Sequence, residues 1–175
     1  MLELLANPLD ALMDFLGAGG NVLVVIMFTT FFMWALIIER LMYWSGAHGG
    51  VSKRAHRAWA ARSDHKSWYA HAVRERLISE TTQEASRFNN VIRALVAVTP
   101  LLGLLGTVTG MVEVFDVMAT TGSSNARLMA AGISKATIPT MAGLVASLSG
   151  LIFINAFDRN VQKASHQISD ELLIE

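Results

Sequence analysis

The sequence predicts an all-α membrane protein with three transmembrane helices. Three long stretches carry no ionisable residue, at 22–38, 94–112 and 136–157. A helix rises about 1.5 Å per residue, so about 20 apolar residues cross the hydrocarbon layer of a membrane. A chain of 175 residues, 53% hydrophobic and 16% charged, has too little other sequence to bury three such helices inside a soluble protein.

Positive charge lies on one side of these stretches. Ten of the fourteen Lys and Arg residues fall between Arg40 and Arg93, and Arg159 and Lys163 follow the third stretch. Positively charged segments stay on the cytoplasmic side during membrane insertion. We therefore expect the N-terminus outside the cytoplasm, and the segment after the first helix and the C-terminus inside.

The first helical segment is expected on the outer membrane surface. Asn7 is typical of a helix N-cap and Pro8 of the first helical position. Leucine and methionine then recur at helical spacing, as in an amphipathic helix that lies in the interface. Gly17, Gly19 and Gly20 separate this helix from the first transmembrane helix.

Charge and periodicity set the other boundaries. Ala85, Phe88, Ile92 and Leu95 continue one apolar face into the second transmembrane helix, so this helix is expected to extend into the cytoplasm. A similar stripe follows the third helix. The expected segments are an amphipathic helix at 1–20, transmembrane helices at 21–44, 94–118 and 128–157, a cytoplasmic helical segment at 45–93, an external loop at 119–127 and a cytoplasmic helical tail at 158–175.

Small residues share one face of the second helix and one face of the third. Small side chains let helix backbones approach closely, which drives helix association in lipid. Packing is therefore the expected role of these residues, rather than chemistry: Gly103, Gly106, Gly110, Gly143, Ser147 and Gly150.

The threonines on these faces, Thr99 and Thr140, allow two interpretations. The hydroxyl of a membrane threonine can bond the carbonyl four residues earlier in its own helix, with no functional consequence. It can also line a polar path. The spacing alone does not separate the two.

Two segments carry a resemblance to a known family. They read TPLLGLLGTVTGM at 99–111 and ISKATIPTMAGLVA at 133–146. With the three-helix topology, they resemble the ExbB/TolQ branch of the MotA/TolQ/ExbB proton-channel family. The resemblance implies a homopentamer in the bacterial inner membrane that encloses the membrane helices of an ExbD-like one-span protein. This complex would use proton flow to drive a TonB-like protein. The TonB-like protein would in turn power uptake across the outer membrane, of iron for example. The short chain favours ExbB over TolQ.

The resemblance also assigns individual residues. It implies that Thr107 and Thr140 line the proton path. Most members have a glutamate five residues before the second threonine, and this chain has Lys135 there. The membrane aspartate of the ExbD-like partner would then carry the proton alone.

Glu113 offers a local counter-charge for Lys135. The two residues lie about 9 Å and 13 Å of helix from the external loop, so their depths are similar. An isolated charge in lipid is costly, and we therefore hypothesise that they pair. The alternative is that each extends separately to the outer surface.

Composition argues against several other functions. The net charge is zero, which gives no indication of a nucleic-acid partner. There is no cysteine and no histidine spacing typical of metal ligands, so no metal or other cofactor is expected. The spans hold no nucleophile-and-base pair, and we expect no enzyme activity.

Two further expectations concern polar residues and function. Glu39 and Arg40, at the inner end of the first helix, are expected to meet lipid headgroups rather than to bind a partner.

Besides the TonB-linked motor, two functions stay open. One is a TolQ-like motor that maintains the envelope, and the other is a non-conducting membrane scaffold, which the missing carboxylate favours. Membrane lipid is an expected partner in each case.

Overall fold

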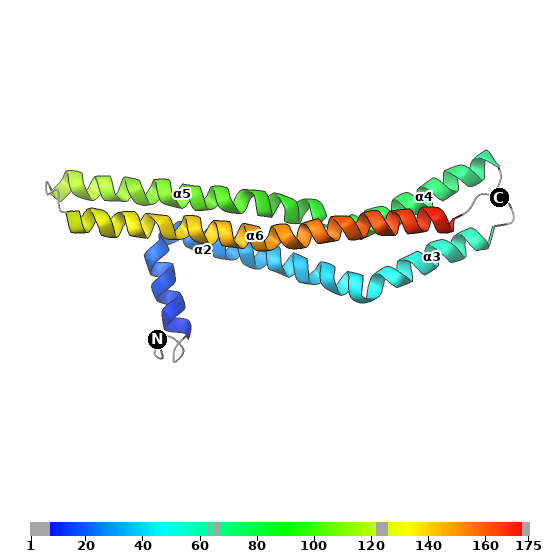
Figure 1. Cartoon of the computed structure of the whole chain (residues 1–175), viewed down its shortest axis with the longest axis horizontal. Coiled ribbons are helices and arrows are strands. Elements are labelled where there is room, and N and C mark those ends of the chain that lie inside the picture. Colours follow the sequence, from blue (N-terminus) through cyan, green and yellow to red (C-terminus); the bar gives the residue numbers. More distant parts are fainter. Residues whose placement is uncertain (1–7, 63, 65–66, 122–125, 173–175) are drawn as a thin grey trace. The chain divides into compact units, whose positions relative to one another are not determined.

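The computed structural model describes residues 8–62, 64, 67–121 and 126–172, with side chains from Gly19 onward except at 47–48, 121–128 and 131. Every regular element among these residues is a helix, so the all-α prediction is confirmed (Figure 1). The elements are α2 (Pro8–Met42), the π-helical turn η1 (Tyr43–Ala47), α3 (His48–Ala60), α4 (Trp68–Ser86), α5 (Asn89–Thr121) and α6 (Ala126–Glu171).

Three helical stretches are long and apolar enough to cross a membrane, as predicted. They are Gly19–Gly46, Trp68–Thr120 and Gly132–Glu171. The apolar face expected on the helix at 1–20 lies outside the described side chains. Of the loop expected at 119–127, residues 122–125 lie outside the described residues, and the others belong to the end of α5 and the start of α6.

The chain divides into two compact units. Unit 1 consists of Met1–Met33 and Ala94–Gly150, and unit 2 of Trp34–Arg93 and Leu151–Glu175. Because α2, α5 and α6 each contribute to both units, every unit contains parts of all three long helices.

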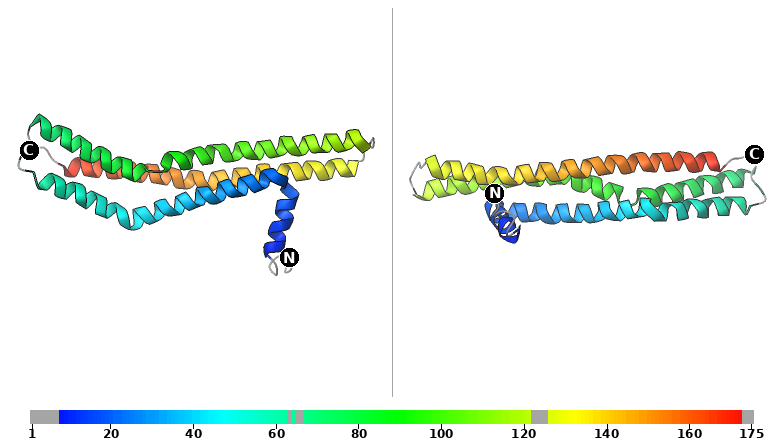
Figure 2. Two further views of the ribbon diagram at one scale, coloured as in Figure 1. Left: turned by 180° about the vertical axis from the view of Figure 1, so that it is seen from behind. Right: turned by 60° about the horizontal axis from the view of Figure 1, so that its bottom comes forward.

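In unit 1, α5 and α6 run antiparallel and side by side, as the views of Figures 1 and 2 show. The buried side chains of Leu23, Ile26 and Met33 mark the inward face of α2. The axis of α2 turns sharply at Gly20, whose φ of 66° and ψ of −166° are not helical (Figure 2). A φ of this sign favours glycine, which has no Cβ to clash.

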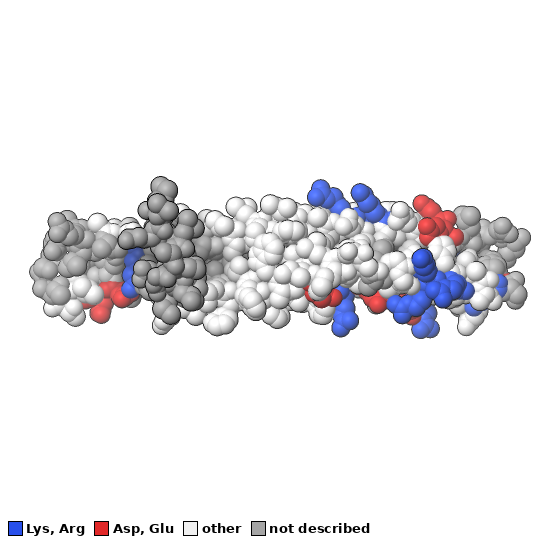
Figure 3. Space-filling view, turned by 90° about the horizontal axis from the view of Figure 1, so that it is seen from below, with Lys and Arg blue, Asp and Glu red and all other residues white. Residues whose placement is uncertain are grey.

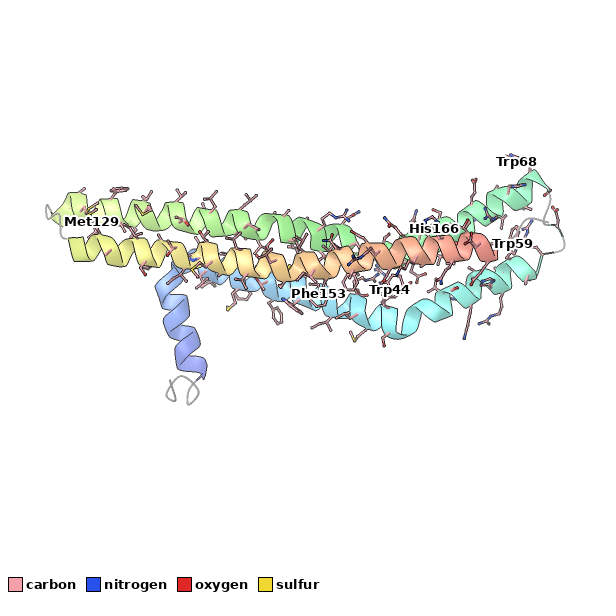
Figure 4. The ribbon with its side chains drawn as sticks, viewed as in Figure 1. Trp44, Trp59, Trp68, Met129, Phe153 and His166 are labelled. Carbon is pink, nitrogen blue, oxygen red and sulfur yellow. The ribbon has the colours of Figure 1, made fainter. Side chains whose placement is uncertain are left out.

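In unit 2, α3, α4 and the end of α6 share a small apolar core. Trp59, labelled in Figure 4, packs with Ala70, Ile168 and Leu172. The guanidinium of Arg74 on α4 donates to the carbonyls of Ser169 and Leu172, at 2.6 and 2.7 Å. These bonds supply partners for carbonyls that have no helical donor at the end of α6.

Charged side chains are concentrated over the same part of unit 2. On the face drawn in Figure 3, most of the Lys and Arg atoms lie over α3 and the C-terminal half of α6. Among the residues of unit 1 whose side chains the structure describes, only Glu113, Asp116 and Lys135 are Asp, Glu, Lys or Arg. The uncharged surface of unit 1 is what a lipid-facing segment requires.

The second helix does not continue uninterrupted into the cytoplasmic segment. The chain leaves the helix at Arg87 and Phe88, and Phe88 has a φ of 68°, so α4 and α5 are separate helices. Ala85 and Ile92 are still buried on either side of the break. The apolar spacing was therefore a correct guide to burial but not to continuity, because the break contains neither glycine nor proline.

Arg40 occupies this break, and its predicted contact with headgroups is wrong. Its side chain is 2% exposed, and its Nη1 donates to the carbonyls of Glu84 and Ala85, at 3.2 and 3.3 Å. Glu39 accepts two further bonds from the guanidinium, at 2.7 and 2.9 Å. The guanidinium carbon lies 5.6 Å from the ring centre of Phe88, within the range of a cation–π contact. Arg40 thus caps the end of α4.

Replacing Arg40 by methionine should loosen the end of α4. The change keeps most of the apolar stem but removes the donor of the buried Ala85 carbonyl, which costs about 1–3 kcal/mol, whereas the Glu84 carbonyl keeps a bond from the backbone N–H of Arg87. Faster amide hydrogen exchange over the last turn of α4 in the purified protein is the expected result. The matched control is Arg76→Met, since Arg76 forms an exposed pair with Glu80 on the same helix. Equal exchange in both variants would contradict the capping role.

Candidate functional site

Glycines bring the backbones of α5 and α6 into contact in unit 1. A Cβ added at Gly103 would lie 3.0 Å from the carbonyl oxygen of Pro139 and 3.0 Å from the Cα of Thr140. A Cβ at Gly143 would lie 2.8 Å from the carbonyl oxygen of Thr99. These neighbours are backbone atoms, which cannot rotate away. Both positions therefore require glycine at this separation of the helices.

The same contact extends along both helices. A Cβ at Gly106 would lie 2.5 Å from the Cβ of Pro139, and one at Gly110 would lie 2.8 Å from that of Ala136. A Cβ at Gly150 would lie 2.6 Å from the sulfur of Met33. It would lie equally close, 2.6 Å, to the Cγ2 of Val96, so Gly150 packs against both α2 and α5.

Two threonine hydroxyls meet inside this contact. The hydroxyls of Thr107 on α5 and Thr140 on α6 are hydrogen-bonded to each other. Thr140 also donates to the carbonyl of Gly103, at 2.8 Å. Because that bond uses the one hydroxyl proton of Thr140, Thr107 must be the donor in the shared bond. A hydrogen-bonded chain thus runs from Thr107 through Thr140 to the backbone of α5.

Other threonines of α5 make only local bonds. Thr99 donates to the carbonyl of Leu95 at 2.6 Å, and Thr109 to that of Leu105 at 3.0 Å. Both are bonds to the residue four positions earlier in the same helix, which need no other partner. Thr99 therefore fits the first of the two interpretations, and among the threonines with described side chains only Thr107 and Thr140 bond across the helices.

Ser147 compensates for a proline in the neighbouring helix. Proline has no N–H, so Pro100 leaves the carbonyl of Val96, four residues earlier, without its helical donor. The hydroxyl of Ser147 on α6 donates to this carbonyl at 2.8 Å. An unsatisfied carbonyl in lipid would cost several kcal/mol. Sequence reasoning assigned Ser147 to packing alone, although the position of Pro100 identifies the carbonyl that needs a donor.

Lys135 and Glu113 lie together at one end of unit 1. The Nζ of Lys135 is 3.6 Å from the Oε1 of Glu113, and the two side chains are 43% and 65% exposed. They border a cavity of about 260 Å³ that also touches Gly20, Asn21 and Gly110. Neither residue bonds the Thr107–Thr140 pair. Among the described side chains of unit 1, no carboxylate therefore lies beside the hydroxyls of Thr107 and Thr140.

No group of three or more potential metal-binding side chains occurs within the described residues. The chemistry available at the helix contact is therefore that of hydroxyls and backbone carbonyls. Such groups can accept and donate hydrogen bonds to a proton carrier. They do not themselves ionise near neutral pH.

Comparison with known proteins decides the family. A model of the MotA/TolQ/ExbB proton channel family matches residues 47–170, which include both threonines and all the glycines of the helix contact. The chain belongs to this family. With three helices able to span a membrane, this member of the MotA/TolQ/ExbB family is a multi-pass membrane protein.

Individual relatives carry ExbB names. The chain is 41% identical over 73 residues to the putative biopolymer transport protein ExbB-like 3 of Synechocystis sp., which is 41% of this chain and 35% of that protein. It is 32% identical over 96 residues to the biopolymer transport protein ExbB of Pseudomonas putida, covering 55% and 29%. It is 37% identical over 95 residues to the biopolymer transport protein exbB1 of Vibrio cholerae, covering 50% and 42%. The matches therefore span less than half the length of each of these relatives.

Gly143→Ala should destabilise the contact between α5 and α6. The new methyl group meets the Thr99 carbonyl, and overpacking of this kind typically costs about 1–3 kcal/mol. We expect faster unfolding of the purified protein in denaturing detergent, measured by circular dichroism. The control is Gly50→Ala on α3, where an added Cβ meets nothing within 4 Å. This control should unfold no faster than the parent protein, because alanine is the better helix former.

Proposed function

We propose that this chain is the ring-forming subunit of a proton-driven motor in the bacterial inner membrane. With an ExbD-like one-span partner, it would energise TonB-dependent transport across the outer membrane. Membership of the proton channel family and relatives named for biopolymer transport support this function. The observation that carries it is the hydrogen-bonded chain between Thr107 and Thr140 across α5 and α6.

Each part of the chain would have a separate task. The glycine contact holds α5 and α6 at one separation, which gives the partner helices a rigid surface to work against. The hydroxyls of Thr107 and Thr140 would exchange hydrogen bonds with a protonated carboxyl group of the partner. Each proton that crosses the membrane supplies about 2.3 kcal/mol per 100 mV, which is enough to bias a conformational step.

The subunit arrangement and topology belong to the same proposal. A pentamer of this chain would surround the partner helices, and a TonB-like protein would receive the motion. The N-terminus would lie outside the cytoplasm, as the distribution of Lys and Arg predicts. Asp116, near the end of α5, and the pair of Glu113 and Lys135 would then face the outer side.

Lys135 supports a second candidate, a scaffold that binds the same partners without passing protons. Within the described residues of unit 1, the threonine pair has no carboxylate beside it, so this chain alone offers no proton-carrying acid there. The two functions separate in cells whose proton gradient has been collapsed by an uncoupler. Transport that continues at its full rate would favour the scaffold, and transport that stops would favour the motor.

Removing either hydroxyl of the pair should slow proton flow. Thr107→Val and Thr140→Val keep the shape of the side chain but break the hydrogen-bonded chain. We expect proton flux to fall about tenfold, which corresponds to about 1.4 kcal/mol in the barrier. The measurement is dye-monitored proton uptake by vesicles that contain this chain and its one-span partner.

Three controls accompany this measurement. Thr107→Ser and Thr140→Ser retain a hydroxyl and should retain most of the flux. Thr99→Val removes a buried hydroxyl that bonds only its own helix, and it should leave the flux unchanged. Normal flux in both valine variants of the pair would remove Thr107 and Thr140 from the mechanism.

A further inference from the structure

The kink in α2 opens a small cavity in unit 1 that the proposed proton path does not use. Gly20 turns the chain, and the cavity beneath it has a volume of about 260 Å³. Its lining combines glycine backbone with the polar side chains of Asn21, Thr109, Glu113 and Lys135. Pockets for drug-sized ligands measure about 300–1,000 Å³, so this cavity suits a smaller polar group.

The cavity lies at the level where the apolar runs of all three long helices end. On this side, the uncharged stretches at 94–112 and 136–157 end directly beside Glu113 and Lys135, and the apolar run of α2 begins directly after Asn21, which follows Gly19 and Gly20. Asn21, Glu113 and Lys135 all line the cavity. Charged and polar side chains are tolerated at the boundary between hydrocarbon and water and are expensive inside it. The cavity therefore marks the boundary of the membrane at this end of unit 1.

Glu113 and Lys135 leave much of their hydrogen-bonding capacity unused. An ammonium has three donors and a carboxylate two acceptor oxygens, yet the two groups are 3.6 Å apart, longer than a charge-assisted hydrogen bond of about 2.7–2.9 Å. Glu113 and Lys135 form no other ion pair or hydrogen bond with the described residues. Both are substantially exposed. A ligand with one anionic and one cationic group could bond both of them.

We propose that this cavity binds the phosphoethanolamine headgroup of a membrane phospholipid. Lys135 would donate to the phosphate, and Glu113 would accept from the primary ammonium. The position at the membrane boundary favours a headgroup over a free ligand, because the acyl chains can lie along the uncharged surface of unit 1. Glu113 also provides selectivity, since a choline headgroup has no N–H to donate.

This proposal can be tested with the full chain alone, so its outcome does not depend on proton conduction. The purified protein is stripped of lipid in detergent and titrated separately with short-chain phosphatidylethanolamine, phosphatidylcholine and phosphatidylglycerol. Native mass spectrometry counts the lipids bound at each concentration. We expect one site that prefers phosphatidylethanolamine to the other two by about tenfold, the effect of one charge-assisted hydrogen bond. Free phosphoethanolamine should bind more weakly than the lipid.

Variants then assign the two contacts. Lys135→Gln should weaken phosphatidylethanolamine binding about tenfold, the effect of losing one such bond. Glu113→Gln should remove the preference for phosphatidylethanolamine over phosphatidylcholine. Arg76→Gln removes the cation of a different exposed ion pair, with Glu80 on α4, and should change neither result.

Several outcomes would overturn the proposal. Equal binding of phosphatidylethanolamine and phosphatidylcholine by the parent protein would exclude recognition of the ammonium, whatever the stability of the variants. A change in oligomer mass in Lys135→Gln, with the lipid count unchanged, would show that the pair contacts a second copy of the chain. Binding of free phosphoethanolamine as tight as that of the lipid would exclude a headgroup site anchored by acyl chains.

Discussion

The backbone contact between α5 and α6 is the constraint on which the rest of unit 1 depends. In lipid there is no hydrophobic gain from bringing two apolar helices together, so packing and interhelical hydrogen bonds must hold them. Gly103 and Gly143 let each backbone touch the other. This separation is also what allows the hydroxyls of Thr107 and Thr140 to meet. A wider contact would separate the two hydroxyls and break the bond between them.

Polar groups in both units are satisfied by side chains from neighbouring helices. Ser147 supplies the donor that Pro100 lacks, and Arg40 supplies donors to the end of α4. Arg74 does the same for the end of α6. In each case at least one acceptor is a carbonyl for which its own helix supplies no donor. The interruptions at Pro100 and at Arg87 and Phe88 are therefore each accompanied by a donor from another helix.

The sequence was a good guide to the helices and a weaker guide to their partners. The absence of charge over 22–38, 94–112 and 136–157 was enough to predict three helices that can cross a membrane, because lipid tolerates few other sequences. The acceptors of Arg40 could not be predicted in the same way. They are backbone carbonyls 44 and 45 residues away, and any residue type carries such a carbonyl.

In the candidate site, too, the sequence predicted some features and not others. Counting residues from the external loop was enough to infer similar depths for Glu113 and Lys135, since helix rise is constant. It gave no information about the cavity beside them, which depends on the turn at Gly20. The direction of the threonine bonds likewise depends on how the two helices are rotated about their axes, and spacing within one helix does not fix that rotation.

The bond from Ser147 to the carbonyl of Val96 has an evolutionary consequence. Its value depends on Pro100, because any other residue at position 100 would restore the helical N–H donor. The two positions should therefore be epistatic: loss of the serine is harmful beside the proline and tolerated without it. Among homologous proteins, a hydroxyl at one position should accompany the imino acid at the other, which provides a pattern of covariation that reports on the contact between these helices.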